Sequence, residues 1–246
     1  MISGSPGDQS AAGRWIGVEP TLLCLAVFFV LLTLGLQTWP GASGWLRFDR
    51  ASYERGAVWQ LLTSQWVHLS IWHAASNAFA LAVIVVASGF WLRWPLQLLA
   101  LCGGYAGVAL VLALDPDCSY YAGASGALHG LLAGNAVAVA WLARPLNLPT
   151  GPYGPAAWVA PSAWIRRLAV AALGLMALKL WLQAEGLLGA PLGGWSFPVY
   201  QPAHIAGALG GMGLVLLFLA ARTRAATKVQ AEPGQRQQDK RVKPAH

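Results

Sequence analysis

Charged residues are scarce in this chain: Asp, Glu, Lys and Arg make up 10% of its 246 residues, while hydrophobic residues make up 57%. Soluble domains carry roughly 25% charged residues, so the composition argues against a soluble protein. The apolar residues also recur in long blocks, which makes the membrane span, rather than the domain, the natural unit of description. We therefore predict a membrane protein.

Cysteine is equally rare, with three residues at Cys24, Cys102 and Cys118. The first two lie within apolar runs and the third lies alone in a polar connection. This placement indicates neither a disulfide framework nor a metal site of the CxxC kind. Acidic residues are absent from the apolar runs. The sequence therefore implies no metal or organic cofactor.

Six apolar blocks are bounded by Pro, Gly or charged residues. They cover residues 20–38, 66–89, 94–114, 125–143, 164–183 and 203–221. Each is close to the roughly 17 to 25 residues that a bilayer-spanning helix needs. The predicted fold class is an all-α polytopic membrane protein, with a six-helix membrane domain over 20–221 between a cytoplasmic segment at 1–19 and a tail at 222–246. The first block also resembles a signal peptide, but five further spans favour an uncleaved helix.

Basic residues determine the predicted orientation. If the helices alternate in direction, Arg14, Arg93, Arg144 and the tail fall on one side, while Asp115 and other acids fall on the opposite side. The positive-inside rule then places both termini in the cytoplasm of a bacterial-type inner membrane. The connection 39–65 is the exception, because it carries three arginines. Rich in Trp and Gly, it is expected to lie against the outer interface.

The tail at 222–246 holds seven of the 16 Lys and Arg residues behind the net charge of +7. Binding of nucleic acid would favour aromatic residues interleaved with the basic ones, and the tail has none. Because it follows an apolar block, we interpret it as a topology signal and expect no nucleic-acid partner. It has too few apolar residues to fold alone, so we predict that it is disordered.

Unusual polar residues recur near one end of the second, fourth and sixth predicted helices. They are His73 and Asn77, Ser125 and His129, and His204. Even-numbered spans run in the same direction, so these residues form one layer, roughly 5 to 15 Å below the outer surface at 1.5 Å rise per residue. Residues four apart also share a helix face. Such groups can simply form hydrogen bonds that hold helices together. A set of them at one depth instead favours a functional site that faces a water-filled cavity.

Glycine recurs at every fourth position in two of these helices. The positions are Gly126, Gly130 and Gly134 in the fourth helix and Gly207 and Gly211 in the sixth. This spacing lets two helix backbones approach closely. Close packing would bring the Ser125 hydroxyl within hydrogen-bond reach of the His204 imidazole, the geometry that a nucleophile and its general base require. The usual meaning of such spacing in membranes is tight packing without catalysis.

GASG at 123–126, HLSIWHAASN at 68–77 and AHIAGALGG at 203–211 are the motifs that contain these polar residues. Together they resemble the GxSG, HxxxN and AHxxGxxxG motifs of the rhomboid intramembrane serine proteases, on the helices expected for that family. The resemblance covers residues 58–220. It implies a six-helix rhomboid core with both ends in the cytoplasm, in agreement with the orientation predicted from charge.

The resemblance also implies residue roles. Ser125 would be the nucleophile and His204 its general base, a dyad without an acid. His73, Asn77 and the backbone N–H of Ser125 would stabilise the oxyanion. Supporting roles would fall to Gly123, Gly126, His129, Gly207 and Gly211.

Three positions depart from the family pattern or stand outside it. Many rhomboids have Tyr where this chain has His129, and a serine followed by LHG resembles the rhombosortase branch, which processes proteins with a short C-terminal Gly-Gly anchor signal. His129 is expected either to stack on His204 or simply to pack. Gln60 replaces the Arg that often follows a Trp before the second helix. Lys179 is expected to snorkel to the outer interface, with a role near a substrate gate as the alternative.

Other functions stay open from the residues alone. His73, His129 and His204 could be zinc ligands, but the HExxH motif is absent. Two of these histidines as axial haem ligands would leave Ser125 and Asn77 without a role. A non-catalytic relative that binds membrane clients would not need both Ser125 and His204. The rhomboid resemblance implies membrane-anchored protein substrates and the lipid bilayer as partners.

Overall fold

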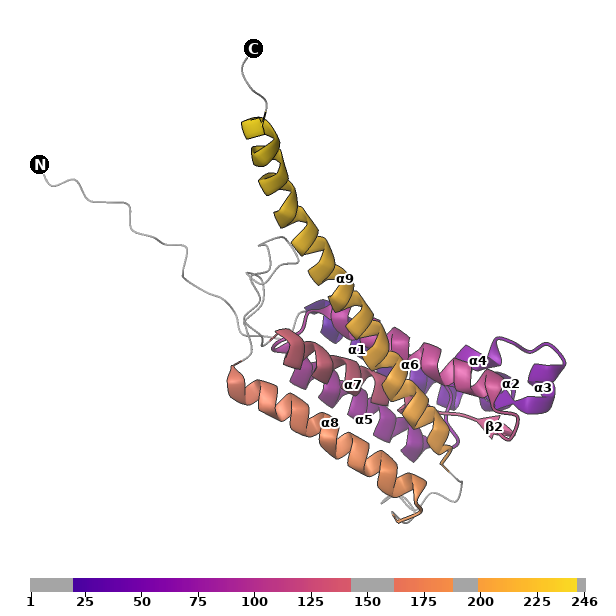
Figure 1. Ribbon diagram of the computed structural model, residues 1–246. Helices are drawn as coiled ribbons and strands as arrows, with labels where there is room; N and C mark the ends of the chain where they lie inside the picture. Colours follow the sequence, from indigo (N-terminus) through magenta and orange to yellow (C-terminus); the bar gives the residue numbers. More distant parts are fainter. Residues whose placement is uncertain (1–19, 143–161, 188–198, 243–246) are drawn as a thin grey trace, which may run out of the picture.

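The computed structural model describes residues 20–142, 162–187 and 199–242, with side chains described as far as residue 225. Within these ranges, six helices have 18 residues or more (Figure 1). They are α1 (Pro20–Thr38), α5 (Ile71–Gly89), α6 (Trp94–Leu114), α7 (Ser125–Leu142), α8 (Ala163–Ala184) and α9 (Gln201–Val242). The mostly helical architecture predicted from the apolar blocks is confirmed.

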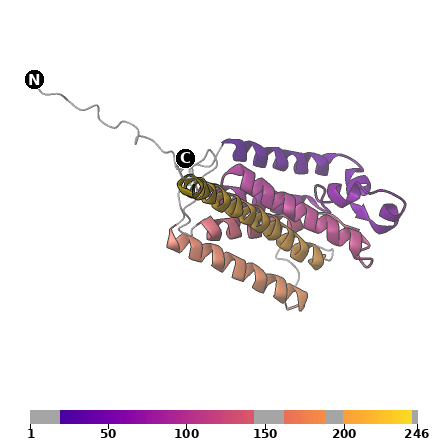
Figure 2. The same ribbon diagram turned by 45° about the horizontal axis from the view of Figure 1, so that its top comes forward.

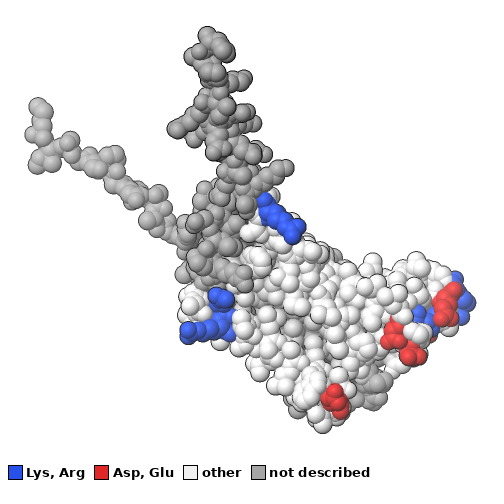
Figure 3. Space-filling view, viewed as in Figure 1, with Lys and Arg blue, Asp and Glu red and all other residues white. Residues whose placement is uncertain are grey.

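Five of these helices are long and apolar enough to cross a membrane: α1, α5, α6, α7 and the Gln201–Ala225 part of α9. Figure 3 agrees, because charged side chains gather at the ends of the bundle and leave the face between them uncharged. Helix α8 has 22 residues but carries Arg166, Arg167 and Lys179. Its crossing of the membrane, and hence the sixth span, stays a prediction.

Three helices, α6, α7 and α9, form the centre of the bundle, and glycine lets them touch. A Cβ added to Gly130 would lie 2.6 Å from the carbonyl oxygen of Gly207, and one added to Gly207 or Gly211 would collide with the α7 backbone. The close packing of α7 against α9, predicted from glycine spacing, is therefore present. Helix α6 joins through Gly103, where a Cβ would lie 2.5 Å from Gly210 O.

The remaining long helices flank this centre. Helices α1 and α5 pack against each other on one side, and α8 lies along the other side against α7 (Figure 2). Only Ile165 and Ala169 of α8 are buried, and both lie in its first half. The half of α8 that carries Lys179 is therefore held to the bundle by few buried apolar side chains.

The connection between α1 and α5 folds into short elements. These are α2 (Ala42–Leu46), β1 (Phe48–Asp49), α3 (Arg50–Glu54) and α4 (Gln60–Thr63). Strand β1 pairs antiparallel with β2 (Tyr120–Tyr121), with Phe48 opposite Tyr121. The connection therefore packs against the segment that leads from α6 into α7.

Two polar side chains anchor this connection. The Arg50 guanidinium donates to the carbonyl oxygens of Leu112, at 2.6 Å, and Asp115, at the end of α6. Gln60 is buried, accepts from the Asp49 N–H at 3.1 Å and donates to Trp45 O at 3.3 Å. Gln60 therefore has a structural role of its own at the position where many rhomboids are expected to have Arg.

One predicted boundary differs from the structure. The second span was expected to begin at residue 66, but α5 begins at Ile71 because the Ser70 hydroxyl caps it, accepting from the His73 N–H at 3.1 Å. Helix α9 extends as far as Val242, and the disorder predicted for the tail from residue 222 stays a prediction.

Candidate active site

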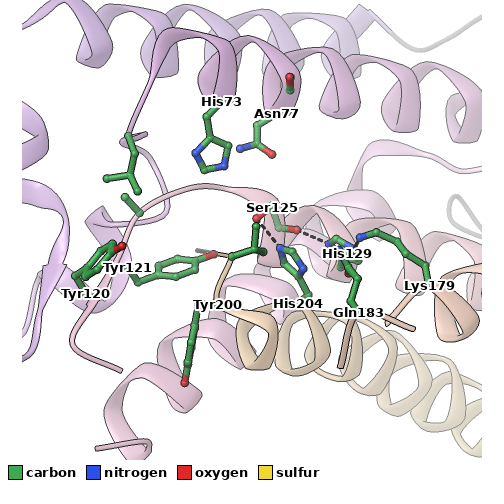
Figure 4. Close-up of a pocket in the computed structure, with 14 residues that line it drawn as sticks. His73, Asn77, Tyr120, Tyr121, Ser125, His129, Lys179, Gln183, Tyr200 and His204 are labelled. Carbon is green, nitrogen blue, oxygen red and sulfur yellow. Dashed lines mark hydrogen bonds between the residues drawn. The ribbon is translucent and has the colours of Figure 1, made fainter. Parts of the chain in front are cut away.

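A cavity of about 240 Å³ lies where α7 begins. Side chains from α5, α7, α8 and α9 line it, together with the segments that carry Tyr120 and Tyr200 (Figure 4). All five residues of the predicted polar layer are among these lining residues: His73, Asn77, Ser125, His129 and His204. The three helices thus bring together the residues that the sequence places at one depth.

Ser125 and His204 are in hydrogen-bond contact, with 2.9 Å between Ser125 Oγ and His204 Nε2. The contact depends on the glycine seam between α7 and α9, which is formed by Gly126, Gly130, Gly207 and Gly211. A Cβ on Gly126 would lie 2.8 Å from the carbonyl oxygen of Ala203, directly before His204. His204 is 5% exposed. A hydroxyl bonded to a buried imidazole is the arrangement that activates a serine nucleophile.

The turn before Ser125 requires glycine. Gly123 has φ +129°, a conformation that residues with a side chain rarely adopt. A Cβ at Gly123 would also lie 2.6 Å from Cε1 of His73. The Gly123 N–H donates to Ser64 O at 2.9 Å, which ties this turn to the segment after α4. Gly123 therefore both shapes the turn and leaves room for the His73 ring.

Hydrogen-bond donors near the Ser125 hydroxyl come from α5 and from the first turn of α7. His73 and Asn77 lie on one face of α5 and point toward Ser125 across the cavity (Figure 4). The Asn77 side-chain nitrogen is buried and has no hydrogen-bond partner among the described residues. Ser125 is the first residue of α7, so its N–H belongs to the amides that have no partner within the helix. These groups are positioned to donate to a developing negative charge.

A family model for the rhomboid domain matches residues 55–221, about two thirds of the chain. The chain belongs to the rhomboid family. Rhomboids are a family of serine peptidases, and the match contains every residue of the polar layer. No curated protein matches the chain significantly. The match thus shows the rhomboid family without distinguishing its branches.

In this rhomboid, His129 stacks on the His204 ring, one of the two arrangements expected for it. The ring centroids are 4.4 Å apart and the planes differ by 18°. His129 Nδ1 lies 2.7 Å from Ser125 O, and its Nε2 lies 2.8 Å from Lys179 Nζ. The expectation that Lys179 snorkels to the interface is therefore wrong, because its ammonium instead points into the site and bonds to His129 (Figure 4).

His68 supports the site, although its sequence motif suggested no role for it. It is fully buried, and its ring meets the His73 ring edge to face with centroids 4.9 Å apart. The Ala124 N–H donates to His68 Nε2 at 3.4 Å, directly before Ser125. Burial, and to a lesser degree His73, lowers the pKa of His68 to about 3. The signal that could have identified His68 from the sequence was a second histidine in an apolar stretch, five residues before His73.

At the rim of the cavity, Tyr200 links the start of α9 to the end of α6. Its hydroxyl donates to the Asp115 carboxylate, which also accepts from the Asp117 N–H at 3.0 Å. The hydrogen bond from Tyr200 is the main reason that the pKa of Asp115 lies below its usual value. Asp115 therefore has a structural role outside the dyad.

The histidine cluster does not have the geometry of a zinc site. Across the described ranges, no group of three or more His, Cys, Asp or Glu side chains is placed to hold a metal ion. Both ring nitrogens of His129 are occupied by Ser125 O and Lys179. His204 Nε2 is bonded to Ser125. Zinc ligation would require these bonds to break.

Proposed function

We propose that this rhomboid is an intramembrane serine endopeptidase in which Ser125 is the nucleophile and His204 the general base. The observation that carries the proposal is the 2.9 Å contact between Ser125 Oγ and His204 Nε2 in a donor-lined cavity. Positioned bases of this kind activate a hydroxyl that is otherwise a weak nucleophile. The rhomboid family supports the same reaction class.

The reaction proceeds in two steps. As Ser125 Oγ attacks the carbonyl carbon of the peptide bond, its proton passes to His204 Nε2, and His204 then donates that proton to the leaving amine. The resulting acyl group on Ser125 is released by water, with His204 again acting as the base. Asn77, His73 and the Ser125 N–H stabilise the oxyanion in both steps, each worth roughly 3 to 4 kcal/mol when well placed.

The general base works without a carboxylate. His204 Nδ1 is buried and has no hydrogen-bond partner among the described residues, and none of the described side chains lining the cavity is Asp or Glu. Orientation of the imidazole therefore comes from the stacked His129 ring and from close packing around Ala203. This arrangement supports a dyad rather than a triad.

The proposed location is the bacterial inner membrane, with both termini in the cytoplasm and the site open to the outer side. Its support is the placement of basic residues at one set of connections and in the tail. Substrates are then membrane-anchored proteins cut in or just outside the outer leaflet. Neither a metal nor an organic cofactor takes part.

The narrower proposal is a rhombosortase that processes exported proteins with a C-terminal Gly-Gly anchor signal. It is supported by LHG at 128–130, where His129 takes the place of the Tyr common in other rhomboids. A general rhomboid that cuts transmembrane segments of varied substrates is the alternative. A non-catalytic relative that binds clients is disfavoured, because Ser125 and His204 are both present and bonded to each other.

Two membrane-anchored reporters test both levels of the proposal. One ends in a Gly-Gly anchor signal and the other contains an ordinary transmembrane substrate segment. Wild type is expected to cut the Gly-Gly reporter alone, and Ser125→Ala and His204→Ala are expected to cut neither. Cutting of the second reporter instead would retain the dyad and reject the rhombosortase branch. Undiminished cutting by Ser125→Ala would reject the serine mechanism.

A further inference from the structure

Two imidazole rings lie face to face beside the nucleophile, but only one is bonded to its hydroxyl. His204 Nε2 contacts Ser125 Oγ, whereas His129 contacts the Ser125 backbone carbonyl. The rings are stacked with 4.4 Å between centroids. A proton that leaves Ser125 therefore has two bases nearby, and the reaction needs it on His204.

The partners of His129 determine where its own proton lies. A carbonyl oxygen can only accept, so the 2.7 Å bond to Ser125 O requires a proton on Nδ1. An ammonium can only donate, so the 2.8 Å bond from Lys179 requires Nε2 to be unprotonated. Beside a charged Lys179, His129 is therefore a neutral imidazole with both nitrogens occupied. It cannot take a second proton unless the bond to Lys179 breaks.

We propose that Lys179 is a positioning residue that holds His129 neutral, so that His204 alone receives the Ser125 proton. The inference rests on the proposed dyad. When His204 becomes an imidazolium, a neutral His129 ring can stay stacked on it, whereas a second imidazolium at this distance would repel it. Lys179 acts through His129 and needs no contact with the reacting atoms.

A different role for Lys179 would be contact with the substrate. Its ammonium lines the cavity. The other titratable groups that line the cavity with the histidine pair are His73 and the tyrosines Tyr120, Tyr121 and Tyr200, and no Asp or Glu is among the described lining residues. A carbonyl or carboxylate of a substrate could therefore accept from it. The two roles predict different kinetics, because the first depends on His129 and the second does not.

A fluorophosphonate probe measures the first role directly. Ser125 Oγ displaces fluoride at phosphorus and its proton passes to His204, so the labelling rate reports proton removal without a protein substrate. Lys179→Met keeps the chain length but removes the donor. We expect kinact to fall about tenfold, the loss of one charge-assisted hydrogen bond, with KI within about twofold. Lys179→Arg should restore most of the rate, and Leu175→Met, at an exposed position of α8, should match wild type.

The His129→Phe background separates the two roles. Phe keeps a ring that can stack but has no nitrogen for Lys179, so adding Lys179→Met should change kinact by less than about twofold. An unchanged tenfold loss in this background, or a rise in KI with kinact intact, would show that Lys179 contacts the probe and would overturn the proposal.

Nitrogen-15 NMR of labelled histidine gives a readout that does not depend on activity. We expect His129 to be the Nδ1–H tautomer in wild type and a mixture of forms in Lys179→Met. A cationic His129 in wild type would overturn the proposal. Labelling of Ser125→Ala as fast as wild type would instead reject the proposed function, while the NMR result would still decide the bond between Lys179 and His129.

Discussion

Asn77 faces the nucleophile with a buried amide nitrogen that has no hydrogen-bond partner among the described residues. Buried donors are normally paired, so an unpaired one at this position is available to an oxyanion. We expect Asn77→Ala to lower kcat about hundredfold with KM little changed, because the bond is made mainly in the transition state. Reporter cleavage at saturating and at limiting substrate concentrations separates the effect on kcat from the effect on KM. Val83→Ala, exposed on the same helix, is the control, and a purely KM effect in Asn77→Ala would contradict the role.

His68 makes the fold sensitive to acid. Its pKa is lowered to about 3 by burial, so between its ordinary value of 6.5 and that value the unfolded chain binds a proton that the folded chain does not. Stability is therefore lost as the pH falls below 6.5. At about pH 5.5, one unit below the unfolded pKa, the loss is about 1.4 kcal/mol.

The variant His68→Gln tests this contribution. Gln keeps an acceptor for the Ala124 N–H but does not titrate, so the stability difference between about pH 7.5 and about pH 5.5 should shrink by about 1.4 kcal/mol. Thermal unfolding in detergent at both pH values measures it. A wild-type-sized difference in the variant would mean that other groups cause the acid sensitivity.

At the scale of helices, the seam between α7 and α9 is the feature on which the site depends. Gly211→Ala would place its Cβ against the carbonyl oxygen of Gly130, so we expect a loss of roughly 1 to 3 kcal/mol in stability and of most activity. Gly213→Ala, two residues later in the same helix, meets nothing within 4 Å and should be neutral or slightly stabilising. Equal effects of the two substitutions on unfolding and on reporter cleavage would contradict the claim that the site depends on close packing at this seam.

Many of the helices and their polar faces could be predicted from local sequence. Apolar runs end near the observed helix ends, and residues four apart share a face, so α1, α6 and the polar layer could be predicted. The tie between Arg50 and the end of α6 joins residues about sixty positions apart, and no local pattern encodes it. Lys179 was mispredicted for a similar reason: snorkelling is the usual behaviour near a helix end, and only the fold brings His129 within 2.8 Å.

At the scale of the whole molecule, the membrane topology depends on α8. Among the described residues, five helices meet the length and apolarity of a span, and α8 carries three cations. If α8 crosses, its two ends lie on opposite sides of the membrane. In a chain whose native cysteines are replaced, Glu185→Cys should react with an impermeant maleimide from outside, and Ser162→Cys only after permeabilisation. Labelling of both from one side would mean that α8 does not cross.

The central claim is that the fold activates Ser125 through His204. Its most direct measurement is mass spectrometry of the purified protein after reaction with a fluorophosphonate, which requires an activated serine but no knowledge of the substrate. We predict a single adduct on Ser125 in wild type and no adduct in His204→Ala, whose serine is intact but lacks its base. An adduct on another residue, or equal labelling of Ser125 in His204→Ala, would contradict the dyad.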